Sequence, residues 1–66
     1  MTRPELKQEF QSQLAKVQES RIILARARAL AVTNGYTKET LALFDEADAK
    51  FADLEASYSD MVEKYS

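Results

Sequence analysis

The sequence predicts an all-α fold: an antiparallel two-helix hairpin that forms a helical coiled coil and dimerises into a four-helix bundle. Three observations predict this. The 66 residues include one Gly and one Pro, apolar residues follow a helical period on both sides of Asn34-Gly35, and the stretch 21–32 is apolar around too much of its circumference for one seam. A chain of this length forms one domain at most, so we treat 1–66 as a single helical-hairpin domain.

The first helix is predicted over about residues 3–33 from the signals at its two ends. Thr2 followed three residues later by Glu5 fits a capping box, with Thr2 as the N-cap. Pro4 falls in the first turn, where its missing N–H costs nothing. Gly35 supplies the left-handed residue with which helices commonly end.

The second helix is predicted over about residues 38–64, after a turn at 34–37. Thr37 is placed as its N-cap, and Glu39 lies in the first turn, where a negative charge faces the positive end of the helix dipole. Because the connection is so short, the two helices are expected to be antiparallel neighbours.

A seam of apolar residues is predicted to join the helices. In the second helix the spacing alternates between three and four residues, as in a coiled coil. Its members are Phe44, Ala47, Phe51, Leu54, Tyr58, Met61 and Tyr65. The first helix answers with Leu6, Phe10, Leu14, Val17, Leu24 and Ala31. Folding the chain at Gly35 is expected to bring Phe10 near Met61 and Val17 near Leu54.

Charged residues interrupt this seam at a regular interval. Arg21 and Arg28 occupy seam positions seven residues apart, and Asp48 and Glu55 flank the seam of the second helix, also seven apart. The pairs Arg28–Asp48 and Arg21–Glu55 are expected to form two charged layers. The layers are either solvated side chains whose stems cover the seam or a device that selects register and partner. A phosphate-binding or catalytic role is a third interpretation.

Large aliphatic residues also lie off the predicted seam. Ile23, Ala27 and Leu30 follow a helical spacing along a flank of the first helix, and Ile22 lies nearby. Large aliphatic side chains grouped on an exposed face are typical of interfaces. We therefore predict that Ile22, Ile23, Ala27 and Leu30 form an interface with a second copy or with a different protein.

The composition excludes several classes of protein. The chain has no Cys and no His, so it forms no disulfide and lacks the ligands of the common zinc and haem sites. The chain is acidic, with a net charge of -2, but residues 1–32 carry +3 from six basic and three acidic residues, whereas residues 33–66 carry -5 from three basic and eight acidic residues. Opposite charges on two helices favour packing them side by side.

No enzyme, cofactor or metal site is predicted. The sequence offers neither the nucleophile–base pair of acyl transfer nor a glycine-rich phosphate loop. A phosphatase or metal-dependent enzyme would depend on Asp45 or Asp48. Neighbouring carboxylates on one helix point in different directions, however, and no Gly bends the chain around an ion there.

Membrane and nucleic acid are not the expected partners. No apolar stretch reaches the roughly 20 residues of a membrane span. The N-terminus is polar and charged, unlike a secretory signal, so we expect a cytoplasmic protein. The basic residues are spread around the first helix, whereas DNA binding needs a concentrated basic surface.

The expected function is protein–protein interaction, by a small adaptor, inhibitor or assembly component of the kind that phage and plasmid genomes encode. The layout of a short hairpin with heptad seams resembles the Rop family of plasmid copy-control proteins, which form dimeric four-helix bundles and bind paired RNA loops. The resemblance is one of layout and carries over no RNA-contacting residue. It implies the alternative function, an RNA-binding dimer, for which the candidate basic residues are Lys16, Arg21, Arg26 and Arg28.

Overall fold

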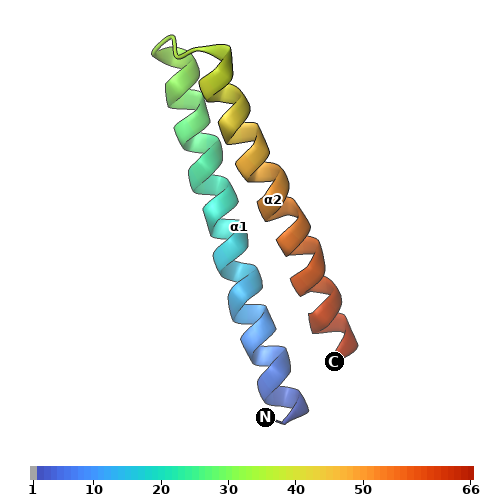
Figure 1. Ribbon diagram of the computed structural model, residues 1–66. Helices are drawn as coiled ribbons and strands as arrows, with labels where there is room; N and C mark the ends of the chain where they lie inside the picture. The colour runs from blue at the N-terminus through green and yellow to red at the C-terminus, as the bar shows by residue number, and fades with distance from the viewer. Residues whose placement is uncertain (1) are drawn as a thin grey trace.

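The computed structural model describes residues 2–66 as two long helices, α1 (Arg3–Thr33) and α2 (Lys38–Lys64). The helices run antiparallel and side by side, with the turn at one end and both termini at the other (Figure 1). The hairpin measures 49 × 15 × 14 Å. The predicted all-α two-helix hairpin is therefore confirmed.

Both helices have the N-cap threonines that the sequence predicts, Thr2 before α1 and Thr37 before α2. The Thr2 side chain accepts a hydrogen bond from the backbone N–H of Glu5 at 3.4 Å and donates one to the Glu5 carboxylate at 3.0 Å. The Thr37 side chain accepts from the backbone N–H of Thr40 at 3.3 Å. Each cap satisfies an N–H that has no partner within its helix.

The turn is a Schellman motif built on Gly35, whose φ is +74°. The N–H of Gly35 donates to the Val32 carbonyl at 3.2 Å, and that of Tyr36 donates to the Ala31 carbonyl at 3.1 Å. These two bonds satisfy carbonyls at the end of α1 and turn the chain back on itself. A left-handed φ is accessible to Gly because it has no Cβ.

The interior of the hairpin is small. Only Val17 and Ala31 are buried among the described residues, and no large side chain is fully buried. The aromatic residues at the open end are half-buried: the Phe10 ring lies 6.2 Å from that of Tyr58 and 5.9 Å from that of Tyr65, centroid to centroid. The two-helix contact thus shields its side chains from only one side.

The structure corrects one half of the predicted seam on α2. The residues that α2 turns toward α1 are half-buried and spaced alternately by three and four: Leu41, Phe44, Asp48, Phe51, Glu55, Tyr58, Val62 and Tyr65. The prediction was right for the aromatic row and wrong for Leu54 and Met61, which are 43% and 38% exposed. The Phe10 ring lies against the rings of Tyr58 and Tyr65.

The physical reason is the polar contact that α1 makes with this helix. Arg21 holds the carboxylates of Asp48 and Glu55 at the seam. Leu54 precedes Glu55 by one residue, and successive helical residues point about 100° apart. When Glu55 faces α1, Leu54 is therefore turned out to the flank of the hairpin.

Candidate functional site

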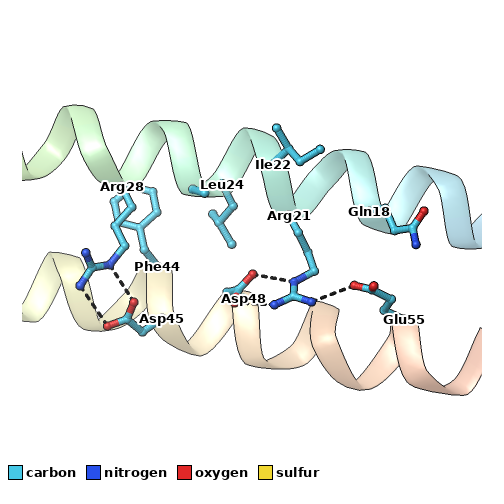
Figure 2. Close-up of a pocket in the computed structure, with 10 residues that line it drawn as sticks. Gln18, Arg21, Ile22, Leu24, Arg28, Phe44, Asp45, Asp48 and Glu55 are labelled. Carbon is cyan, nitrogen blue, oxygen red and sulfur yellow. Dashed lines mark hydrogen bonds and ion pairs between the residues drawn. The ribbon is translucent and has the colours of Figure 1, made fainter.

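A cluster of charged side chains crosses the seam at the middle of the hairpin. Arg21 Nε donates to Asp48 Oδ1 at 2.9 Å, and its Nη2 donates to Asp48 Oδ2 at 3.1 Å. Its Nη1 donates to Glu55 Oε2 at 2.8 Å. The guanidinium thus lies between two carboxylates that are seven residues, or about two helical turns, apart in the same seam row (Figure 2). Only the planar fork of Arg reaches two such partners at once.

A second ion pair lies nearer the turn. Arg28 Nε donates to Asp45 Oδ1 at 2.8 Å, and its Nη2 lies 3.4 Å from Asp45 Oδ2 (Figure 2). The structure thus forms the predicted Arg21–Glu55 pair but not the predicted Arg28–Asp48 pair. Both oxygens of Asp48 are already occupied by Arg21, so Arg28 binds the carboxylate one turn closer to the hairpin turn.

The pKa shifts follow from these hydrogen bonds. The hydrogen bond to Asp48, followed by that to Glu55, raises the pKa of Arg21 and fixes its positive charge. The hydrogen bond from Arg21 lowers the pKa of Asp48 below its usual 3.8. Both groups are thereby held in the charged state in which they pair.

The charged cluster, defined as Arg21, Arg28, Asp45, Asp48 and Glu55, lines one flank of the hairpin. It borders an open groove of about 450 Å³ whose other walls include Gln18, Ile22 and Ala25. Two guanidinium groups pair with three carboxylates across the groove, which leaves the cluster one net negative charge. It therefore presents paired charges rather than a reactive nucleophile or an unpaired cation.

The opposite flank is apolar. Two shallow hollows adjoin there, because both are lined by Thr40 and Phe44. Helical spacing of seven residues places further side chains in the same rows. We define the apolar face by its apolar members on the two helices: Ile23, Ala27 and Leu30 of α1, and Leu43, Ala47, Leu54 and Met61 of α2. The same rows also hold Lys16 of α1 and Lys50 of α2. The five large apolar side chains of this face are all exposed.

The structure divides the four residues that the sequence groups as an interface. Ala27 and Leu30 line one hollow of the apolar face, and Ile23 lies one heptad before Leu30. Ile22 instead lines the groove of the charged cluster (Figure 2). Residues 22 and 23 are about 100° apart on the helix, which is enough to place them on opposite sides of the hairpin.

Leu54 and Met61 of the apolar face were predicted as seam residues, and Leu43 was not predicted as a contact residue. Leu54 and Met61 fit the spacing of a seam, and the sequence does not distinguish a seam row from the row beside it. Leu43 stood apart from both predicted stripes, although its signal was visible: it is a large aliphatic residue off the seam, seven residues before the polar Lys50. All three become members of one surface only when α2 is rotated as the structure has it.

Residues 2–66 can also be compared with what a metal site, a membrane-spanning helix and an active site require. Residues 2–66 contain no group of three or more carboxylates gathered as a metal site would require. Neither helix over that range has the length and apolar character needed to cross a bilayer. Asp45 and Asp48, on which a phosphatase or metal-dependent enzyme would depend, are each bound to an arginine.

No family model matches the chain, and neither the curated proteins nor the solved structures include a significant match to it.

Proposed function

We propose that the protein is a small protein–protein interaction module that acts through helix packing, as an adaptor, inhibitor or assembly component. Its first partner is a second copy, with which it forms a dimeric four-helix bundle. The observation that carries the proposal is the exposed apolar face. The five large apolar side chains of that face remain in water, whereas within residues 2–66 the hairpin itself buries only Val17 and Ala31.

Exposure on this scale is costly for so small a chain. Each large aliphatic side chain contributes roughly 1.5–3 kcal/mol when it is moved from water into a protein interior. Chains of this length rarely gain enough from one small core, and without disulfides or metal they commonly gain the rest by oligomerising. A second hairpin laid on the apolar face supplies that burial.

The size of the surface agrees with this. A flank of the hairpin is 49 Å long and 15 Å wide. The projected area of such a flank is about 700 Å², enough room for an interface of the roughly 800 Å² of accessible surface that each partner of a specific complex buries.

Sedimentation equilibrium over a wide range of concentration tests the proposal. We expect a species of twice the 7.5 kDa of one chain. Because only the folded chain dimerises, the melting temperature should also rise with chain concentration. A mass of one chain at every concentration, with a melting temperature independent of concentration, contradicts the proposal. In that case a different protein would have to be sought for the apolar face.

The alternative function, an RNA-binding dimer, has less support. Two of its four candidate residues, Arg21 and Arg28, are bound to carboxylates. Lys16 and Arg26 are the exposed cations that remain of that set. RNA binding would weaken steeply as the salt concentration rises, because counterions are released from the phosphates. Association through an apolar interface would not weaken in this way.

The proposal includes no catalysis, cofactor or metal, and it assumes an accessory protein of a phage or plasmid that works in the cytoplasm.

A further inference from the structure

We infer that the second copy lies apolar face to apolar face with the first, related by a two-fold axis parallel to the hairpin. In this arrangement α1 of each copy packs beside α2 of the other, and both turns lie at the same end of the bundle. The inference rests on the proposed self-association. The competing arrangement has its two-fold axis across the hairpin, pairs each helix with its own copy, and puts the turns at opposite ends.

The contacts within one hairpin fix which residues are level with one another. Arg21 is level with the interval between Asp48 and Glu55, and Phe10 is level with the interval between Tyr58 and Tyr65. A two-fold axis parallel to the hairpin leaves every residue at its own height. The same levels therefore apply between α1 of one copy and α2 of the other.

The charges beside the apolar face favour unlike helices as neighbours. The outer edge of α2 carries an acidic residue every seven positions: Glu39, Glu46, Asp53 and Asp60. If each α2 lay against its own copy, these acidic rows would face each other, with Asp53 opposite Asp53 and Glu46 opposite Asp60. Like charges placed opposite one another cost affinity and disfavour that arrangement.

Two basic residues of α1 complement the acidic row: Arg26 on the outer edge, and Lys16 in the row of Ile23 and Leu30. At the levels set by the hairpin, Arg26 lies beside Glu46 of the second copy. Lys16 lies beside the interval between Asp53 and Asp60 of the second copy. Glu46 and Asp60 thus each gain a basic neighbour, whereas Asp53 is also level with the acidic Glu19. Two-fold symmetry repeats these contacts on the other side of the bundle.

The sizes of the side chains are compatible with this arrangement. Ile23 lies within two residues of the level of the small Ala47 of the second copy, and Leu54 of the second copy lies within two residues of the level of the small Ser20. Lys50 and Lys16 lie equally close to these levels, and their long stems can cover apolar side chains.

Two adjacent isoleucines provide a matched test of the face. Ile23 and Ile22 are 57% and 55% exposed, but they lie on opposite flanks. Ile23→Lys should weaken dimerisation by at least about 30-fold, as expected for a charge placed in the centre of an interface. Ile22→Lys should change the dissociation constant by less than about threefold, within the small effect expected of a surface substitution. Equal weakening by both variants overturns the assignment of the face.

Distances between spin labels test the direction. The chain has no Cys, so Lys38→Cys places a single label beside the turn. Turns at the same end give a distance below about 30 Å, from helix spacings of 8–10 Å and two label arms. Turns at opposite ends give a distance near the 49 Å length of the hairpin. A Glu63→Cys label at the other end of the hairpin gives an independent second distance.

The outcomes separate this inference from the proposed function. A dimer with long distances at both labels overturns the arrangement and leaves self-association standing. A chain that is monomeric at all concentrations overturns both. A dimer with short distances at both labels supports the direction. Dissociation of that dimer by Ile23→Lys and not by Ile22→Lys supports the face.

Discussion

Arg21 binds Asp48 through two parallel hydrogen bonds, of 2.9 and 3.1 Å, across the seam between α1 and α2. This pair decides how α2 is rotated against α1. It places Asp48 and Glu55 at the seam, where the apolar spacing predicted Leu54 and Met61. The displaced apolar side chains join Ile23 and Leu30 on one flank. A polar contact inside the hairpin thereby creates the apolar surface outside it.

Replacing Arg21 with Lys should destabilise the hairpin although it keeps the charge. A Lys ammonium is a single point of charge and does not hold Asp48 and Glu55 together as the guanidinium fork does. We expect a lower melting temperature at a fixed chain concentration, measured by circular dichroism. Arg28→Lys is the control, because Arg28 binds one carboxylate only. Equal losses in the two variants would show that bridging two carboxylates adds nothing.

Removing the charged layer altogether tests whether it selects register. The variant Arg21→Leu, Asp48→Ala and Glu55→Leu replaces the layer with apolar side chains of mixed size. Replacing partly buried ion pairs with apolar residues is often neutral or stabilising, whereas loss of a polar layer relaxes the register and oligomeric state of coiled coils. We expect a melting temperature no lower than that of the parent, together with several oligomeric species in sedimentation velocity. A single species identical to the parent would assign the layer to solvation alone.

Stability should depend on pH through Asp48. Its pKa in the folded protein lies below the usual 3.8, because Arg21 donates hydrogen bonds to the charged form. A lowered pKa stabilises the fold fully above the unfolded value, and that contribution is lost as the pH falls through the folded value. The difference in melting temperature between the parent and Asp48→Asn should therefore be present at neutral pH and vanish at strongly acidic pH. Glu63→Gln, at an exposed position outside the charged cluster, controls for the loss of one negative charge. A difference that persists unchanged in acid would refute the role of the pair.

Gly35→Ala should destabilise the turn through the backbone alone. Gly35 has a φ of +74°, and a Cβ at this position would meet nothing within 4 Å. The left-handed conformation costs a residue with a Cβ about 1–2 kcal/mol. Urea unfolding at a fixed chain concentration should show this loss, and Gly35→Asn should show a smaller one, because Asn tolerates the conformation better. Equal stability of all three proteins would mean that the turn has another conformation in solution.

Phe10 should be the main apolar anchor at the open end of the hairpin. Its ring lies about 6 Å from those of Tyr58 and Tyr65, and it is half-buried. Phe10→Ala should cost about 2 kcal/mol, roughly half the cost at a fully buried position. Phe10→Leu keeps most of the apolar volume and should cost less. Hydrogen exchange of the last turns of α2 should accelerate in Phe10→Ala. Exchange at the parent rate would show that the aromatic contact does not hold this end together.

The local features of the fold could be predicted from the sequence because each depends on neighbouring residues. Thr2 and Thr37 cap helices through bonds to N–H groups three residues away, and Gly35 turns the chain by its own backbone freedom. The aromatic row of α2 was identified from its seven-residue spacing. Part of the candidate surface, Ile23, Ala27 and Leu30, followed from helical spacing in the same way.

What the sequence by itself determined is that this chain forms two helices, where they begin and end, and that they fold back on each other. Only the tertiary structure decided how far α2 is rotated about its axis, and with it which flank receives Leu54 and Met61 and why Ile22 and Ile23 lie apart. The physical reason is that spacing defines rows of residues on a helix, whereas the rotation depends on a contact between residues far apart in the chain. Here that contact is the pair of salt bridges from Arg21 to Asp48 and Glu55.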